Sequence, residues 1–344
     1  MRHDKDITVL VADAGGTNVR VALGTVRGKQ FSATARKDYR TAEFKSLTPV
    51  IEDFLQTSSS GSKIQALAVC GAGPVRSQKI VMSNADFSIT LSDLESKFGL
   101  PTVIMNDFSA MTWGVLALNM EEEGNHVCIH GTPRNSGSKA PVVALGPGTG
   151  LGFGYAVYHG AIPCVFASEG GHTAIPAWDR RSGELAAFVQ SKFPEGFDAE
   201  KVISGPGLAV LYEFIGTVNG RREEDPIAAL PVKERPARIT KLALEGNKNA
   251  VETIELFVSL LARFCAEAAA VFLPESIFIT GGVCQKIKGL MSRELFSAHF
   301  SGAWAPALSP VLSDTPVFLA GDEDTGLQGL AYAAATHLFE GAKS

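Results

Sequence analysis

The stretch "ITVLVADAGGTNVRVALGTV", residues 7–26, contains two apolar runs on either side of a short turn rich in glycine. In the second run Val19, Val21 and Leu23 recur at every other position. This period of two is typical of a β-strand with one buried face. Glycines permit a tight reversal of the chain between two strands. We therefore predict that a β-hairpin opens the fold.

A second stretch, "APVVALGPGTGLGFGYAVYHG" at residues 140–160, has the same pattern about 130 residues later. It too is an apolar strand, a small-residue turn that contains Gly-Thr, and an alternating strand. Two such units favour duplicated domains, although two glycine-rich hairpins could also coincide by chance. Elsewhere, strand-like runs alternate with helical patterns, which indicates α/β architecture.

The bulk composition sets limits on the class of protein. A chain of 344 residues exceeds the size at which a single core usually stops growing, so we expect two domains. With 45% hydrophobic and 19% charged residues, it resembles an ordinary soluble globular protein. A formal net charge of −5 argues against nucleic acid as a partner, because phosphate backbones are bound by clustered Lys and Arg.

Location can also be predicted. The charged opening "MRHDKD" precedes an apolar run of strand length, which is not the pattern of a secretory signal. The longest helical stretch, residues 249–272, has an apolar stripe typical of a core helix and too many charges for a membrane span. Five cysteines without a CxxC pair fit reduced thiols. We predict a cytoplasmic protein that contacts no membrane.

The two glycine-rich turns could hold phosphate. Glycine lets successive backbone N–H groups point at an anion, and Thr17 and Thr149 add hydroxyl groups. Asp13 could hold Mg²⁺ through water. Neither turn has the Walker pattern or opens a helix as a dinucleotide fingerprint would. Each turn, and the pair Gly281–Gly282 after the strand "SIFIT", could instead need glycine only for its own geometry.

A carboxylate stands at the end of another predicted strand. In "TVIMNDFSA", residues 102–110, Asn106 and Asp107 follow an apolar run. Such an Asp often starts a turn or caps a helix. Taken alone, His172 reads as a structural histidine and Glu200 as a solvated helix-end charge.

Several motifs in order carry a family resemblance over nearly the whole chain. They are "VADAGGTNVRVAL", "MNDFSA", "LGPGTGLG", "SEGGHTAIP", "EKVISGPGL", "FITGGV" and "TGLQGLA". The chain resembles the bacterial-type, hexokinase-type glucokinases of the actin and sugar-kinase superfamily. The resemblance implies two actin-like, ribonuclease H-like α/β domains with mixed sheets flanked by helices, and nucleotide and sugar in the interdomain cleft. It implies a small domain of residues 1–110, completed by a helix at 322–344, and a large domain of residues 111–321.

The resemblance also implies an activity and its residues. The family phosphorylates the 6-hydroxyl of D-glucose with ATP and Mg²⁺, and the residue that matches its general base is Asp107. The matching sugar ligands are Asn106, Asp107, Glu169, His172 and Glu200. The matching nucleotide residues are Asp13, Gly15, Gly16, Thr17, Asn18, Gly148, Thr149, Gly150, Gly281 and Gly282. The family further implies a homodimer.

Other readings stay open. The same carboxylates could serve a kinase for another hexose or an amino sugar. A sugar-sensing regulator would need a DNA-binding module, and none precedes the opening strand. An actin-like ATPase would not need the sugar-binding set. No structural metal is expected, because "EGGH" is followed by "TAIPAWDRR" without cysteine, and His126, Cys128 and His130 lack an evident fourth ligand.

Overall fold

The computed structural model describes residues 6–58, 63–82, 85–122, 124–133, 139–220, 227–302, 304–322 and 324–339. The chain divides into two compact units. The first comprises Met1–Asn125, His159–Ala167 and Gly321–Ser344, and the second comprises His126–Tyr158 and Ser168–Ala320. Residues 1–5 and 340–344, which the sequence assigned to the small domain, lie outside the described residues.

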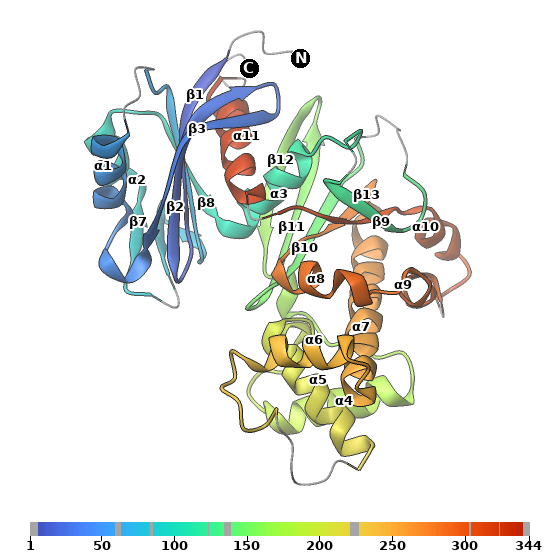
Figure 1. Ribbon diagram of the computed structural model, residues 1–344. Coiled ribbons are helices and arrows are strands. Elements are labelled where there is room, and N and C mark those ends of the chain that lie inside the picture. The colour runs from blue at the N-terminus through green and yellow to red at the C-terminus, as the bar shows by residue number, and fades with distance from the viewer. Residues whose placement is uncertain are drawn as a thin grey trace. The chain divides into compact units, whose positions relative to one another are not determined.

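The first unit is built on a five-stranded sheet in the order β3-β2-β1-β4-β8 (Figure 1). Its strands are β1 (Ile7–Ala14), β2 (Asn18–Arg27), β3 (Gln30–Arg40), β4 (Ala66–Gly71) and β8 (Thr102–Asn106). β1 runs antiparallel to β2, with Ala14 opposite Val19, and parallel to β4, which in turn is parallel to β8. The predicted opening hairpin is confirmed.

A six-stranded sheet, in the order β12-β11-β10-β13-β14-β9, contains the second hairpin. Its strands are β9 (His126–His130), β10 (Val142–Pro147), β11 (Leu151–His159), β12 (Ile162–Ser168), β13 (Ser276–Ile279) and β14 (Val317–Ala320). β10 is antiparallel to β11, with Pro147 opposite Leu151, and parallel to β13, which is parallel to β14. Five of its strands thus repeat the strand order of the first sheet, so the repeated sequence pattern corresponds to repeated topology.

Helices and short segments complete each unit. The first unit contains η1 (Thr41–Glu43), α1 (Leu47–Thr57), α2 (Leu91–Phe98), α3 (Asp107–Ala117), α11 (Thr325–Phe339) and the strands β5 (Val75–Arg76), β6 (Lys79–Val81) and β7 (Ser88–Thr90). The second unit contains η2 (Gly170–His172), α4 (Arg180–Lys192), η3 (Ala199–Lys201), α5 (Gly205–Val218), α6 (Arg235–Leu244), α7 (Lys248–Phe272), α8 (Gly282–Ile287), η4 (Lys288–Leu290), α9 (Arg293–Ser301) and α10 (Ser309–Asp314).

The C-terminal helix α11 packs tightly on α3 in the first unit. A Cβ on Gly329 would lie 1.9 Å from the carbonyl oxygen of Ala110, and one on Gly114 would lie 2.1 Å from that of Thr325. Glycine therefore allows the two helices to approach closely. Because the whole of α3 packs here, residues 111–125 group with the first unit, whereas the sequence reading placed its domain boundary near residue 110.

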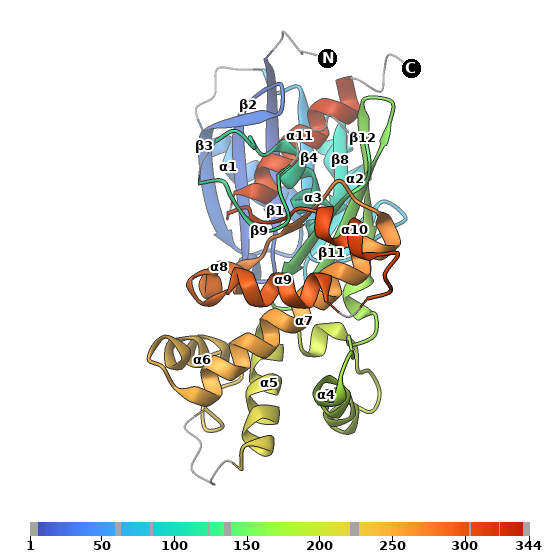
Figure 2. The ribbon, with the colours of Figure 1, turned by 90° about the vertical axis from the view of Figure 1, so that its right-hand side faces the viewer.

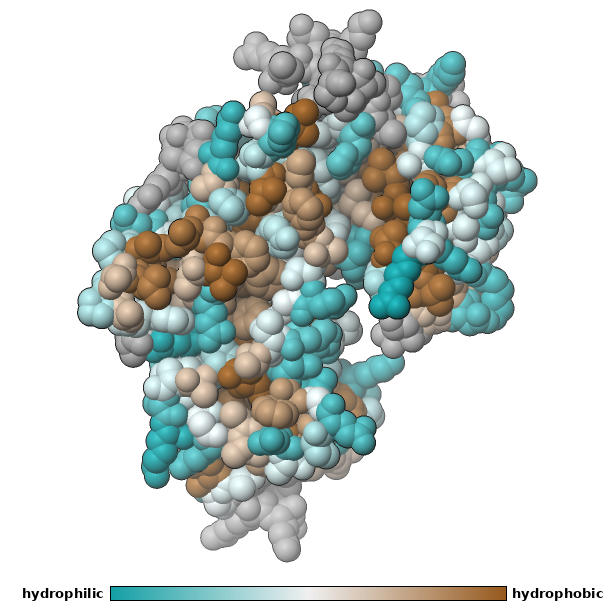
Figure 3. Space-filling view, turned by 180° about the vertical axis from the view of Figure 1, so that it is seen from behind, coloured by the Kyte–Doolittle hydropathy of each residue, from teal (hydrophilic) through white to brown (hydrophobic). Residues whose placement is uncertain are grey.

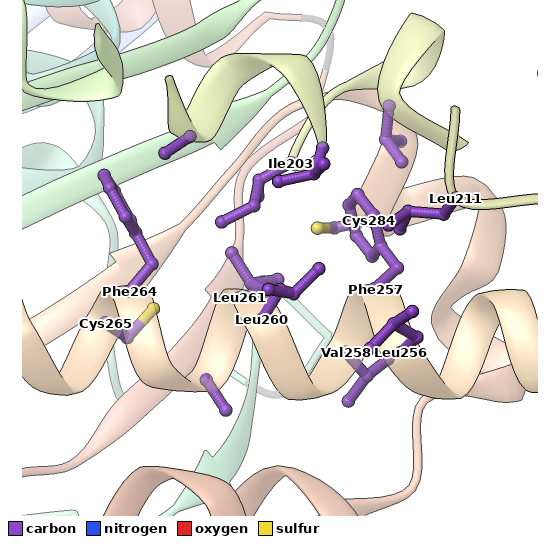
Figure 4. Close-up of a cluster of buried hydrophobic side chains, with 14 of the residues drawn as sticks. Ile203, Leu211, Leu256, Phe257, Val258, Leu260, Leu261, Phe264, Cys265 and Cys284 are labelled. Atoms are coloured by element: carbon purple, nitrogen blue, oxygen red, sulfur yellow. The ribbon is translucent and has the colours of Figure 1, made fainter. Parts of the chain in front are cut away.

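The long helix α7 forms the centre of the second unit's core, with α5 and α6 beside it (Figure 2). Its buried face includes Phe257, Leu261 and Phe264, which lie with Ile203 and Cys284 in one apolar cluster (Figure 4). The predicted core stripe is confirmed. No helix in the part of the chain that the structure describes has the length and apolar run needed to cross a bilayer.

The surface mixes polar and apolar residues (Figure 3). Large apolar side chains that remain exposed include Val271 and Leu273 at the end of α7. Single apolar residues are ordinary on protein surfaces, because there is too little polar surface to cover a folded chain.

Candidate functional site

The carboxyl ends of three parallel strands bring acidic residues together in the first unit. Asp13 is the penultimate residue of β1 and pairs in register with Cys70 of β4. The next residue of β4, Gly71, pairs with Asn106, the last residue of β8. Because parallel strands end at one edge of a sheet, Asp13 and Asp107 lie near the same edge.

Asn106, not Asp107, caps helix α3. The Oδ1 atom of Asn106 accepts hydrogen bonds from the backbone N–H groups of Phe108, at 2.9 Å, and Ser109, at 3.0 Å. Its Nδ2 donates to Oδ1 of Asp107 at 2.8 Å. Phe108 N also donates to that oxygen, at 2.8 Å. Among the described residues, Oδ2 of Asp107 has no hydrogen-bond partner, so this oxygen is available to a substrate.

The local environment changes the acidity of Asp107. Burial and the negative charge of Asp13 raise the pKa of Asp107 to about 6, against the hydrogen bonds from Phe108 N and Asn106. A carboxylate with a pKa of about 6 is still mostly ionised at neutral pH. It is also a stronger base than an ordinary Asp, and the optimal pKa of a general base lies close to the working pH. Asp107 therefore has the charge and the free oxygen that proton abstraction needs.

Asp13 is held by two side chains that the sequence analysis did not single out. Its Oδ1 accepts a hydrogen bond from the Sγ of Cys70 at 3.2 Å, and its Oδ2 lies 3.7 Å from a guanidinium nitrogen of Arg20. Burial raises the pKa of Asp13, and burial together with the charge of Asp13 raises the pKa of Cys70 well above its usual value. Their positions opposite Asp13 on neighbouring strands are the only sequence signal for this contact.

The turn after β1 is supported from one side and open on the other. Gly15 N donates to the Asn18 carbonyl at 2.9 Å, and the buried Thr41 hydroxyl donates to the Gly15 carbonyl at 2.7 Å. A Cβ on Gly16 would meet no atom within 4 Å. The side chains of Thr17 and Asn18 are exposed. No contact within the chain therefore requires a glycine at position 16. The open space beside it could hold a ligand.

The turn after β10 also has one glycine that contacts the rest of the protein and one that faces open space. A Cβ on Gly150 would lie 2.5 Å from Oε2 of Glu200, so a larger residue there would displace the Glu200 carboxylate. A Cβ on Gly148 would meet nothing within 4 Å, and Thr149 is exposed. The start of α5 supports this turn, because Gly205 N donates to the Gly148 carbonyl at 2.8 Å.

In the glycine pair after β13, Gly281 is packed against the backbone and Gly282 faces open space. Gly281 has φ of +90°, and a Cβ there would lie 2.6 Å from the carbonyl oxygen of Pro147. Backbone geometry alone therefore explains why residue 281 is a glycine. Gly282, the first residue of α8, is exposed and has open space where a Cβ would lie.

The predicted sugar ligands of the second unit lie on two short turns, η2 and η3, and come close together. Nε2 of His172 lies 3.9 Å from Oε2 of Glu169. Oε2 of Glu200 accepts a hydrogen bond from Leu151 N at 3.0 Å, which ties the residue to the turn after β10. A backbone hydrogen bond of 2.8 Å from Ala199 N to the Thr173 carbonyl joins the two turns.

Asp198 is a member of this group that the sequence analysis missed. Its Oδ2 lies 2.9 Å from Nδ1 of His172. This hydrogen bond, followed by the charges of Glu200, Asp198 and Glu169, raises the pKa of His172. The only sequence signal was an acidic residue two positions before Glu200. The structure thus places Asp13, Asn106 and Asp107 in the first unit and the group around His172 in the second.

Comparison with known proteins identifies the family. A sequence model of the family described as glucokinase matches residues 10–337. A glucokinase of Allorhizobium ampelinum is 30% identical over 99% of this chain and 96% of its own length. A solved glucokinase structure from an Antarctic psychrotroph has a TM-score of 0.82 and 26% identity, and covers 95% of this chain and 98% of that one.

Some relatives are longer than this chain. The "Bifunctional protein glk" of Burkholderia orbicola is 28% identical over 96% of this chain, which spans only 49% of that protein. The match to the family model runs from within β1 to within α11. By the extent of these matches, the chain belongs to the glucokinase family.

Proposed function

We propose that this protein transfers the γ-phosphoryl group of ATP to the 6-hydroxyl of D-glucose, with Asp107 as the general base. The observation that carries the proposal is that Asp107, in a chain of the glucokinase family, has one fixed carboxylate oxygen, one carboxylate oxygen that is free within the described part of the chain, and a raised pKa. Its Oδ1 is fixed by Asn106 and Phe108, and its Oδ2 has no partner among the described residues. Its pKa of about 6 leaves it ionised at neutral pH.

In this mechanism Asp107 removes the proton from the 6-hydroxyl as that oxygen attacks the γ-phosphorus. The new O–P bond forms while the bond to the β,γ-bridging oxygen breaks, and ADP leaves. A positioned base contributes roughly 10²–10⁴ to the rate of such a transfer. Asp107 keeps its orientation throughout, because the N-terminus of α3 holds it.

We assign the remaining sugar hydroxyls to Asn106, Glu169, His172 and Glu200. Carboxylates only accept hydrogen bonds, and a buried acceptor left unpaired disfavours an analogue that lacks the hydroxyl. Since the Oδ1 of Asn106 caps α3, its contribution to the sugar is an N–H of its amide.

We assign the phosphates of ATP to the two glycine-rich turns and the nucleoside to the turn after β13. The open positions Gly16, Gly148 and Gly282 would let the backbone approach the nucleotide, with Thr17 and Thr149 as hydroxyl donors. Gly15, Asn18, Gly150 and Gly281 shape these turns.

Asp13 fits the role of holding a hydrated Mg²⁺ ion. A single carboxylate suits this ion, which keeps several waters and takes its other ligands from substrate phosphates. When bound, Mg²⁺ would neutralise charge on the phosphates. Cys70 and Arg20 hold the Asp13 carboxylate at the end of β1.

We also propose a cytoplasmic homodimer, on the family resemblance and on five cysteines without a CxxC pair. Light scattering coupled to size exclusion, across a range of protein concentrations, would measure the assembly. A monomer at all concentrations would contradict this part of the proposal.

The test of the activity is to incubate the protein with MgATP and glucose and to identify the product by mass and by ³¹P NMR. We expect glucose 6-phosphate in amounts equal to the ADP formed. Mannose, fructose and glucosamine form the substrate panel. Faster turnover of one of these would make the protein another hexose kinase. ATP hydrolysis that no sugar accelerates would support an actin-like ATPase, and sugar binding without turnover would support a sensor.

A further inference from the structure

The imidazole of His172 lies between two carboxylates. Nδ1 is 2.9 Å from Oδ2 of Asp198, and Nε2 is 3.9 Å from Oε2 of Glu169. The first distance is a hydrogen bond, whereas the second is too long for one. A hydroxyl oxygen placed beside the line that joins these two atoms can lie at hydrogen-bond distance, about 2.8 Å, from both.

The Asp198 side chain does not cap the short helix that follows it. Asp198 is the N-cap residue of η3, with extended backbone angles, but its side chain makes no capping hydrogen bond. Its Oδ1 is buried without a hydrogen-bond partner, and the nearest cation, Lys201 Nζ, is 3.8 Å away. An Asp at an N-cap normally accepts from the first turn of its helix. Here the carboxylate is directed to His172 instead.

The turns that carry this pair are fixed relative to each other. Ala199 N donates to the Thr173 carbonyl at 2.8 Å, next to the His172–Asp198 contact. Thr173 is itself held by its hydroxyl, which donates to the Gly170 carbonyl at 2.8 Å. One backbone hydrogen bond and one from the Thr173 hydroxyl therefore hold the segments that carry Asp198 and His172.

We propose that Asp198 is a positioning residue for sugar recognition, which fixes the His172 ring so that Nε2–H donates to one sugar hydroxyl while that hydroxyl donates to Glu169. This proposal rests on the proposed function. The hydrogen-bond count is balanced, because both carboxylates only accept, both ring nitrogens donate, and the hydroxyl accepts once and donates once. The chemical class that fits is a polyol hydroxyl, and a deoxy sugar at this position would leave His172 and Glu169 unpaired.

The arrangement requires a protonated imidazole. The charged groups that act on His172 are Asp198, which is the N-cap of η3, Glu200 on η3 and Glu169 beside η2, and Lys201 lies 3.8 Å from the other oxygen of Asp198. The hydrogen bond to Asp198 and the nearby carboxylates raise the pKa of His172, which keeps the ring cationic to higher pH than usual. Sugar affinity should thus be highest below the pKa of His172 and should fall as pH rises through it.

The first measurement needs no substrate. The His172 Cε1–H resonance is followed by NMR from about pH 5 to about pH 9 and is assigned by its loss in His172→Ala. In Asp198→Asn the pKa of His172 should be lower than in the wild-type protein, because a charged acceptor is replaced by a neutral one. The matched control is Glu213→Gln, which removes an exposed carboxylate that pairs with Lys192 at 2.8 Å in the same unit. This control should leave His172 unchanged.

The second measurement is glucose binding by calorimetry without ATP. Asp198→Ala should weaken binding about tenfold, the loss expected for a hydrogen bond to a charged group, and should leave the KM for ATP unchanged. In a His172→Ala background the same change should have less than about a twofold effect, because residues that act through one another are not additive. Asp198→Asn should move the fall in affinity to lower pH.

The outcomes separate this proposal from the proposed function. If the pKa of His172 is the same in Asp198→Asn as in the wild type, or if the two alanine variants weaken glucose binding independently, Asp198 does not act through His172. If the NMR titration shifts as expected but the wild-type protein binds no glucose, the proposed function fails, and the sugar role of Asp198 fails with it. Circular dichroism of each variant shows whether it has folded.

Discussion

The two sheets share one strand order but carry different chemistry at corresponding positions. The penultimate residue of β1 is Asp13, opposite Arg20 on β2, whereas the penultimate residue of β10 is Gly146, opposite Gly152 on β11. At the outer parallel strand, β8 leads into Asp107, whereas β14 ends at Ala320 and leads into a glycine. At these two corresponding positions the first unit has acidic residues and the second unit has uncharged ones.

The second unit obtains its polar groups from outside the sheet. Glu169, His172 and Glu200 lie on or beside the turns η2 and η3, and Asp198 supports them. Duplication accounts for the two similar glycine-rich turns, while the proposed base, Asp107, and the proposed sugar ligands Glu169, His172 and Glu200 belong to different units. This division predicts that removal of the Asp107 carboxylate affects turnover, whereas changes around η2 and η3 affect sugar affinity.

The largest effect should come from Asp107→Ala. We expect kcat to fall by at least about a hundredfold, because the general base is removed, while glucose still binds. Glucose affinity is measured by calorimetry and turnover by coupled ADP detection. Near-normal turnover in this variant would remove Asp107 from its assigned role. An equal loss of binding and turnover would mean that the division between the units is wrong.

The next largest effect is on stability of the first unit. Gly329→Ala would place a Cβ 1.9 Å from the Ala110 carbonyl oxygen, between α11 and α3. We expect a loss of about 3 kcal/mol in the free energy of unfolding, at the upper end of the usual cost of overpacking. Gly183→Ala in α4, where a Cβ meets nothing within 4 Å, is the control. Equal urea midpoints for the two variants would contradict the close packing of the C-terminal helix.

A smaller effect tests whether the two turns act alike. Gly16→Ala and Gly148→Ala place a methyl group where the protein has no atom within 4 Å, so the melting temperature should not change. If a nucleotide occupies that space, the KM for ATP should rise about tenfold in both variants, with the KM for glucose unaffected. A change in only one variant would show that only one turn holds phosphate.

The smallest effect is the pH dependence near neutrality. The base must be ionised, so kcat/KM for glucose should be half-maximal near the pKa of Asp107, about 6, and should fall as pH decreases below it. The loss at high pH should follow His172 in the second unit, in the opposite direction. A rate that is constant between about pH 4 and about pH 7 would show that no group with the raised pKa controls the reaction.

Sequence alone predicted those parts of the structure that have a local pattern. The alternation of Val19, Val21 and Leu23 and the glycines before them determine a hairpin, and the apolar stripe around Phe257 determines a core helix. The candidate ligands came from motif resemblance, and the structure brings Glu169, His172 and Glu200 together.

The remaining features depend on contacts through space. Asp198 reaches His172 from another turn, Thr41 supports the first glycine-rich turn from η1, and Cys70 donates to Asp13 from the neighbouring strand. None of these pairs has a fixed spacing in the sequence. The sequence allows helix capping as an alternative role for Asp107, and the structure gives this role to Asn106; Asn and Asp cap helices about equally well, so only the geometry distinguishes them.

A crystal structure of the protein with glucose and a non-hydrolysable ATP analogue would test the central claim most directly. The account predicts that Oδ2 of Asp107 lies within about 2.6–3.2 Å of the 6-hydroxyl oxygen. It also predicts Glu169 and His172 on other hydroxyls and both glycine-rich turns on the phosphates. Glucose bound away from Asp107, or with a different hydroxyl facing it, would contradict the account.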